Sequence, residues 1–190
     1  MYKRQSVVNA ARVSYAKEKE EFEESDERLI RYLAEHKHWS PFAHTFLSFR
    51  IKAPVFVARQ LVKHQVGLVW NEESRRYITY DPEIYNIRKW RKKPDSSKQG
   101  SGEQILISTE LNLEVNEHLQ QGLSLYNRLL LENVAPEQAR AVLPQSMYTN
   151  WIWSGTLYAF ARVCELRLDE HSQKETQEIA RQLDLSLIHI

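Results

Sequence analysis

Residues 60–77 hold the side chains whose types and spacing could bind an anion. The first part of this stretch continues an apolar-periodic run that predicts a helix ending at Gly67. On such a helix Gln60, Lys63 and His64 share one face, because side chains three and four residues apart are neighbours. An amide, an ammonium group and an imidazole would therefore meet on one side of the helix.

The second part of the stretch predicts extended backbone, in which Glu72, Ser74 and Arg76 point to the same side. A guanidinium fork matches the oxygens of a phosphate, and a serine hydroxyl can donate beside it. A solvated, charged turn is the alternative interpretation. The variety of the polar groups, and the apolar residues on both sides of them, favour a phosphate site.

Further arginines lie toward the C-terminus, at Arg140, Arg162 and Arg167. Arg167 is also about one helical turn from His171. An arginine in an otherwise apolar helix is unfavourable unless it has an anionic or strongly accepting partner. Two interpretations stay open: a salt bridge with Glu165 or Asp169, or a site for an anionic planar ligand.

Several other chemistries find little support. Cys164 lies in an apolar segment, where a thiol is expected to be buried and inert. His36, His38 and His44 are close in sequence, but no cysteine or carboxylate completes a zinc spacing, so no metal is expected. Ser74 lacks the setting of a hydrolase nucleophile, and the chain has no Gly-rich dinucleotide fingerprint or phosphate-binding P-loop.

Length and charge set the broad class. The chain has 190 residues, enough for one domain with a sizeable core, and a net charge of +1, which gives no global field for nucleic acid or a membrane surface. Its one cysteine excludes a disulfide framework and favours a reducing compartment. No apolar run is long enough to cross a bilayer.

The pattern of apolar residues predicts a mostly helical chain with some strand. Alternation at residues 45–52 predicts a strand, and the basic segment 91–102 is expected to be a solvated loop. Helical periodicity predicts helices at residues 25–38, 103–132, 136–144, 150–168 and 169–183.

The two ends of the chain have an unusual composition. Residues 185–190 read as the translation of a transposon end sequence used to prepare sequencing libraries, and residues 1–5 read as the translation of its reverse complement. We expect both ends to derive from adapters, and one native catalytic domain to span residues 6–184. Native codons for these termini in an intact genome would refute this hypothesis.

The ordered motifs resemble those of the flavin-dependent thymidylate synthases. The family signature reads Arg-His-Arg-x-x-Ser-x-Asn-Glu-x-Ser-x-Arg, and this chain has Lys63-His64-Gln65 followed by Asn71-Glu72-Glu73-Ser74-Arg75-Arg76. Further matches follow in family order: Ala10-Ala-Arg-Val-Ser14, Ser40-Pro-Phe-x-His44, Lys52-Ala-Pro-Val-Phe-Val-Ala-Arg-Gln60, Ala139-Arg-Ala-Val-Leu-Pro144, Tyr148-Thr149 and Leu166-Arg-x-x-x-His171.

This resemblance implies a fold and an activity. The fold would be α/β of the α+β kind, with an antiparallel-rich sheet packed with long helices. The enzyme would be a cytoplasmic homotetramer with active sites at subunit interfaces. It would bind FAD and convert dUMP to dTMP with methylene-tetrahydrofolate and NADPH. In the family's scheme, reduced flavin relays the one-carbon unit, and the arginine at position 167 stabilises the ionised pyrimidine.

The resemblance also assigns residues. The catalytic residues would be Arg167 and His38. The residues that bind dUMP would be Gln60, Lys63, Glu72, Glu73, Ser74, Arg75, Arg76, Arg140 and Arg167. At positions 73 and 75 the backbone would make the contact. Contacts to the flavin would come from Ser40, Lys63, His64, Gln65, Glu72, Thr156, Tyr158, Arg162 and His171.

The departures from the family pattern concern the flavin side. Lys63 and Gln65 stand where arginines are usual, Ala43 replaces a glutamate, and Thr156 and Arg162 replace asparagines. Arg162 is expected to restore the cation lost at Gln65. Similar variants occur in phage members, so a viral source fits. Two alternatives stay open: a dUMP hydroxymethylase, and an inactive dUMP-binding homologue.

Overall fold

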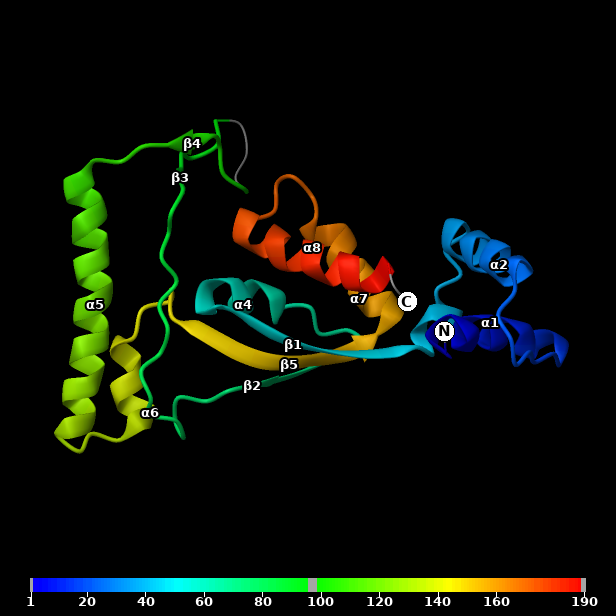
Figure 1. Ribbon diagram of the computed structural model, residues 1–190, viewed down its shortest axis with the longest axis horizontal. Helices are drawn as coiled ribbons and strands as arrows, with labels where there is room; N and C mark the ends of the chain where they lie inside the picture. Colours follow the sequence, from blue (N-terminus) through cyan, green and yellow to red (C-terminus); the bar gives the residue numbers. More distant parts are fainter. Residues whose placement is uncertain (1, 96–98, 189–190) are drawn as a thin grey trace.

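A three-stranded antiparallel sheet forms the centre of the molecule (Figure 1). The computed structural model describes residues 2–95 and 99–188. The strands are β1 (Phe46–Pro54), β5 (Tyr148–Thr156) and β2 (Leu68–Glu72), in the order β1-β5-β2. The expected strand at residues 45–52 is therefore confirmed, and so is the mixed α+β class with an antiparallel sheet.

The central strand β5 corrects one prediction. Residues 150–168 were expected to form a single helix, but their first part belongs to β5, and only Leu157–Arg167 is helical (α7). Buried and less buried side chains alternate along β5, with Trp151 and Trp153 buried and Ile152 exposed. This alternation suits a sheet with one covered face. The strand gives way to α7 at Thr156, whose hydroxyl accepts a hydrogen bond from the backbone N of Ala159 at 3.1 Å.

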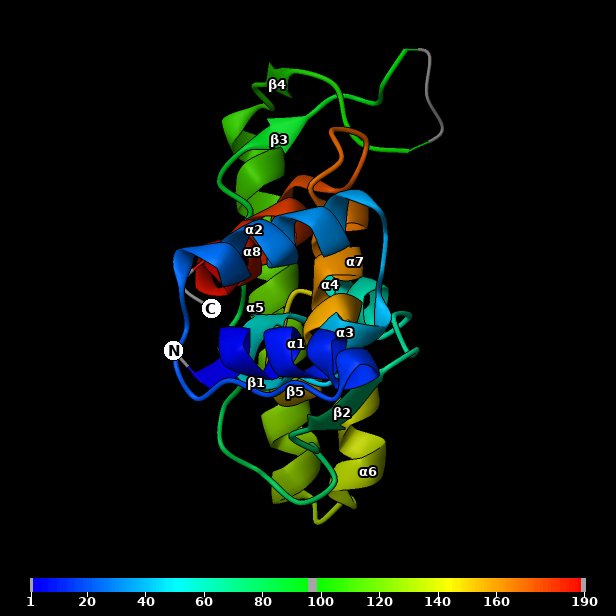
Figure 2. The same cartoon turned by 90° about the vertical axis from the view of Figure 1, so that its right-hand side faces the viewer.

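Three helices cover one face of this sheet, as the two ribbon views show (Figures 1 and 2). They are α4 (Val55–Leu61), α7 and α8 (Lys174–Ile188). Apolar side chains from this sheet face and these helices form the core, which includes Leu47, Ile51, Val57, Leu61, Trp151, Trp153, Phe160, Val163 and Leu183.

The helix α4 is shorter than the periodicity predicts. It ends at Leu61 and not at Gly67, so Lys63 and His64 lie in the turn that follows. The prediction that these two residues share a helical face with Gln60 was therefore wrong. Gly67 has a φ of 73°, a value that favours glycine, and it directly precedes strand β2.

The remaining helices lie at the two ends of the sheet (Figure 1). One end holds α1 (Tyr2–Arg12), the 3₁₀ turn η1 (Val13–Tyr15), α2 (Glu24–Glu35) and α3 (Ser40–Ala43). The other end holds α5 (Thr109–Leu131), α6 (Pro136–Ala139) and η2 (Arg140–Val142). Helices expected near residues 25–38, 103–132 and 136–144 are thus present, with shifted ends.

A small hairpin encloses the segment 91–102 that was expected to be a solvated loop, of which residues 96–98 lie outside the described residues. Its strands are β3 (Trp90–Arg91) and β4 (Gln104–Ile105). Residues 104 and 105 were expected to be helical, but α5 begins only after Ser108, whose hydroxyl accepts from the backbone N of Leu111 at 3.1 Å. The serine cap fixes the start of the helix and leaves the preceding residues free to pair.

The suspected adapter ends continue regular structure where they are described. Residues 2–5 belong to α1 and residues 185–188 to α8, while positions 1, 189 and 190 lie outside the described residues. No helix among the described residues combines the length and apolar character that a membrane span needs.

Candidate active site

Arg167 and His64 come together from distant parts of the chain. Arg167 is the last residue of α7, and its Nε donates a hydrogen bond to Nε2 of His64 at 2.8 Å. Burial, and then the charge of Arg167, lower the pKa of His64 below its ordinary value. His64 is therefore neutral at pH 7, with its proton on Nδ1, because Nε2 must accept.

This contact identifies His64 as the partner of Arg167, which the sequence left open. The two carboxylates considered from the sequence are engaged elsewhere: Glu165 pairs with Arg162, and Asp169 accepts from the backbone N of His171 at 2.8 Å. Within residues 2–95 and 99–188, no hydrogen bond engages the two Nη atoms of Arg167. A guanidinium held through Nε alone keeps its terminal nitrogens for a ligand.

Gln60 lies in the last turn of α4 and is half-buried. Its Nε2 donates to Oε1 of Gln173, and its Oε1 accepts from the hydroxyl of Thr176 at 3.2 Å. The sequence assigned no role to Gln173 or Thr176. The one feature of the sequence that could have indicated a role for Gln173 is its position two residues after His171, which was a predicted site residue. Lys63 is exposed beside this group.

The predicted phosphate site lies just beyond strand β2. Nε of Arg76 and Oγ of Ser74 are 3.2 Å apart, so the expected hydroxyl and guanidinium do lie together. The carboxylate of Glu72 turns away and accepts from the hydroxyl of Thr149 at 2.7 Å. The strand ends at Glu72, so the two-residue period that would align it with Ser74 does not continue.

Neighbouring residues secure this turn. Glu73 accepts from Nδ2 of Asn150 at 3.0 Å. Arg75 is 5 % exposed, donates to the carbonyl of Tyr80 and places its guanidinium 4.6 Å from the ring centroid of that tyrosine. Its side chain thus supports the turn, which leaves its backbone for a ligand. Arg140 is exposed and donates to the carbonyl of Glu137 at 3.2 Å.

A cavity of about 330 Å³ collects another set of predicted residues, at the junction of α2, α3 and α7. His38, Tyr158 and Arg162 line it, together with Lys37 and Trp39, which the sequence assigned no role. The ring centroids of Trp39 and Tyr158 are 5.7 Å apart. Aromatic faces beside cationic groups fit a planar, phosphate-bearing cofactor such as a flavin nucleotide.

The other residues expected near a flavin are spread around this cavity and elsewhere. Ser40 lines a neighbouring cavity of about 430 Å³ that shares His38 and Trp39. The hydroxyl of Thr156 caps α7, while Gln65 and His171 are exposed. In the described part of the chain, no cluster of three or more His, Cys, Asp or Glu side chains could hold a metal ion.

The single chain thus presents three groups of predicted site residues: one at Gln60, His64 and Arg167, one at residues 72–76, and one around the cavity with His38. Among the residues that the structure describes, no hydrogen bond, ion pair or ring contact joins one group directly to another. Cys164 belongs to none of them. It is 4 % exposed, which confirms the expected burial, and this burial raises the pKa of its thiol to about 11.

The fold and these groups define an α+β protein with clusters of cationic, polar and aromatic side chains. The family model described as thymidylate synthase complementing protein matches residues 1–187. The chain therefore belongs to this family, whose relatives are named flavin-dependent thymidylate synthases, and it is an enzyme. The resemblance found in the sequence is confirmed.

Three relatives illustrate the similarity, and each is named flavin-dependent thymidylate synthase. That of Kosmotoga olearia is 41 % identical over 179 residues, covering 92 % of this chain and 76 % of the relative. That of Thermus thermophilus is 38 % identical over 176 residues, covering 93 % and 64 %. That of Dictyostelium discoideum is 37 % identical over 178 residues, covering 92 % and 58 %.

Proposed function

We propose that the protein converts dUMP to dTMP by reductive methylation, with FAD as cofactor and methylene-tetrahydrofolate and NADPH as co-substrates. The observation that carries this proposal is Arg167, a cation held through Nε by a neutral histidine. Such a fixed charge stabilises the negative charge of an ionised pyrimidine ring without reorganising during the reaction. Arg167 is thus the residue that activates uracil.

His64 serves this role in two ways. As a neutral acceptor it orients the guanidinium, and it adds no charge that would compete with Arg167 for the pyrimidine. A protonated His64 would have no lone pair at Nε2, so the contact depends on the neutral form.

The nucleotide phosphate binds at Ser74 and Arg76, with the backbone of residues 73 and 75. The 3.2 Å approach of the two side chains supports this assignment, because one phosphate oxygen can be reached from both. Gln60, Lys63, Glu72 and Arg140 contact other parts of dUMP.

The flavin is held by the residues around the cavity. At the cavity these residues are His38, Ser40, Tyr158 and Arg162. The remaining flavin contacts come from residues that line neither cavity, namely His64, Gln65, Glu72, Thr156 and His171, with Lys63 at the border with dUMP. A flavin bound there supplies the reducing equivalents. His38 is exposed at the cavity wall, where it lies close to the reacting groups and serves as a catalytic residue.

The active site is shared between subunits of a cytoplasmic homotetramer. The separation of the three groups within one chain supports this part of the proposal, because residues that act on one nucleotide must come together. A second copy of the chain can bring the phosphate group of one subunit to the Arg167 group of another. The native domain spans residues 6–184.

The flavin itself supplies the test. Purified protein is loaded with FAD, and its absorbance spectrum is recorded before and after addition of dUMP. We expect retained flavin and a saturable spectral change with dUMP, absent with deoxyuridine at the same concentration. A protein that retains no flavin, or whose absorbance spectrum does not change when dUMP is added, would refute the proposal.

A further inference from the structure

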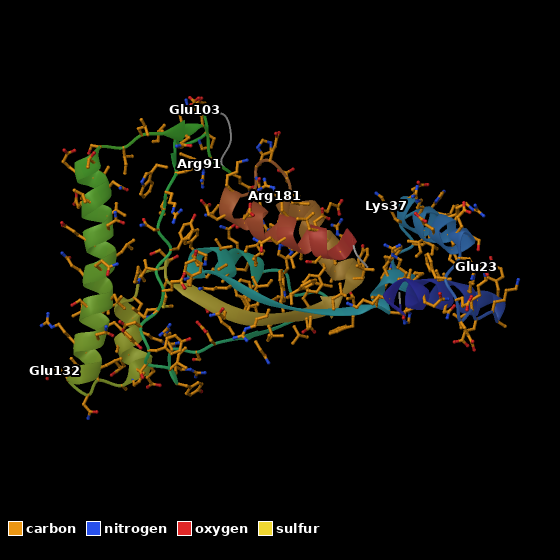
Figure 3. The ribbon with its side chains drawn as sticks, in the orientation of Figure 1. Glu23, Lys37, Arg91, Glu103, Glu132 and Arg181 are labelled. Carbon is orange, nitrogen blue, oxygen red and sulfur yellow. The ribbon has the colours of Figure 1, made fainter. Side chains whose placement is uncertain are left out.

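A partly buried ion pair joins the β3–β4 hairpin to helix α8. Nη2 of Arg91 lies 2.6 Å from Oε1 of Glu175, and the two side chains are 22 % and 13 % exposed. Nε of Arg91 also donates to the hydroxyl of Ser101 at 2.7 Å. Arg91 is thus held on the hairpin side and on the helix side at once, at the position that Figure 3 labels.

From this ion pair, hydrogen bonds lead to Gln60. Nε2 of Gln173 donates to Oε2 of Glu175 at 3.0 Å. Oε1 of Gln173 accepts from Nε2 of Gln60, and Oε1 of Gln60 accepts from the hydroxyl of Thr176 at 3.2 Å. We call this chain of contacts, Arg91–Glu175–Gln173–Gln60, the amide relay.

The amide relay has a direction, which the ion pair sets. A carboxylate can only accept, so Gln173 must turn its NH₂ group to Glu175 and its carbonyl to Gln60. Gln60 must then turn its own NH₂ group to Gln173 and its carbonyl to Thr176. The hydroxyl of Thr176 both donates and accepts, so it would tolerate either orientation and cannot fix it.

The charge state of Glu175 supports this direction. Burial raises the pKa of Glu175, but hydrogen bonds from Arg91, Gln173 and the backbone, together with the charge of Arg91, outweigh burial and bring the pKa below its ordinary value. The carboxylate is therefore ionised at neutral pH. The hairpin also packs against the segment before α8, since a Cβ on Gly100 would lie 3.0 Å from the carbonyl oxygen of His171.

We propose that Arg91 and Glu175 are positioning residues that fix the amide of Gln60 for dUMP. The amide relay uses one N–H and one lone pair of Gln60 and leaves the other N–H and lone pair at fixed places for the ligand. An amide free to flip would present either group at random. This inference rests on the proposed contact between Gln60 and dUMP.

The first experiment needs no ligand. Side-chain amide resonances of Gln60 and Gln173, assigned with Gln60→Ala and Gln173→Ala, are compared between wild type and Glu175→Gln. A glutamine at position 175 can donate as well as accept, so the orientation of Gln173 is no longer fixed. We expect the Gln60 resonances to shift or broaden. The matched control is Glu178→Gln on the same helix, which breaks an exposed pair with Arg181.

The second experiment measures the dissociation constant of dUMP. Glu175→Gln, Arg91→Gln and Gln173→Met should each weaken binding about tenfold, the loss expected for one ligand hydrogen bond. Gln173→Met interrupts the amide relay while leaving the ion pair in place, so it separates positioning from folding. Glu178→Gln and Lys92→Gln, which alter exposed ion pairs, should change binding less than twofold.

The decisive comparison is made in a Gln60→Ala background. There Glu175→Gln should have no further effect on dUMP binding, because the residue through which it acts is gone. A full additional loss in that background, or unchanged dUMP binding in Glu175→Gln and Gln173→Met, would overturn the amide relay and leave the proposed function intact. A wild-type enzyme that does not bind dUMP would overturn the proposed function. The amide resonances of Gln60 in Glu175→Gln would still show whether the amide relay fixes the orientation of Gln60.

Discussion

Nε of Arg167 donates to Nε2 of His64 over 2.8 Å and so ties the end of α7 to the turn after α4. The two residues are far apart in sequence, and the contact uses only one of the guanidinium nitrogens. This geometry makes a neutral histidine the partner of the cation that we propose to activate uracil. Its consequences for pH can be measured directly.

The titration of His64 should show both causes of its lowered pKa. Burial is the larger cause, and the charge of Arg167 is the smaller one. Arg167→Met should therefore raise the pKa of His64, measured by NMR, but leave it below the ordinary value of 6.5. A wild-type value at or above 6.5 would contradict the neutral, accepting histidine.

The same shift predicts a dependence of stability on pH. Between the lowered pKa of folded His64 and 6.5, the unfolded chain binds a proton that the folded chain does not. The free energy of unfolding should fall as the pH drops through this interval, and this contribution should level off below it. His64→Gln keeps an acceptor but does not titrate. This variant should lose this contribution to the pH dependence of the free energy of unfolding, measured by urea unfolding at several pH values.

The phosphate site makes a separate prediction for ligand binding. Ser74→Ala and Arg76→Gln should each weaken dUMP binding by about tenfold or more, because hydrogen bonds to charged groups contribute about 1.5–3 kcal/mol. Binding of deoxyuridine, which has no phosphate, should not change. Arg31→Gln, which alters an exposed pair with Glu27 on α2, provides the control. Equal weakening of both ligands would place the phosphate elsewhere.

Substitution of Arg162 tests the proposed flavin contacts. Arg162 lines the cavity and pairs with Glu165 one helical turn away, with half of its side chain exposed. If it replaces the cation missing at Gln65, Arg162→Ala should release FAD during gel filtration while dUMP still binds the remaining holoenzyme. Arg181→Ala removes a similar pair on α8 and should retain FAD. Equal loss of FAD and dUMP affinity would refute this role.

Asp26 is predicted to dominate the stability of the N-terminal helices. Its side chain is fully buried, accepts from the backbone N of Glu23 at 2.9 Å and pairs with Arg12. Asp26→Ala should lower the free energy of unfolding by about 3–5 kcal/mol, because it leaves a largely buried guanidinium unpaired. Glu24→Ala breaks an exposed pair with Arg28 on the same helix and should cost no more than about 1 kcal/mol.

The sheet shows where sequence reasoning succeeded and where it failed. Alternation predicted β1, because its polar and apolar residues differ clearly. The same alternation exists in β5, but Trp151, Ile152 and Trp153 are all apolar and lead into the largely apolar residues of α7, so the two elements were predicted as one helix. Pairing with strands on both sides decides the outcome, and those strands come from residues far away in sequence. Short windows do not contain that information.

The candidate site shows the same division. Ser74 and Arg76 could be placed together because their contact is local. The Arg167–His64 contact and the amide relay could not, since each joins segments that only the folded chain brings together. Arg91 was expected in a solvated loop for this reason. Its partner, Glu175, lies in a helix that follows 84 residues later.

The central claim is that this chain methylates dUMP. The most direct measurement incubates the FAD-loaded protein with dUMP, methylene-tetrahydrofolate and NADPH and determines the mass of the nucleotide product. The account predicts a product with the mass of dTMP, and its loss in Arg167→Ala. A hydroxymethylated nucleotide, or dUMP returned unchanged by a protein that retains FAD, would contradict it.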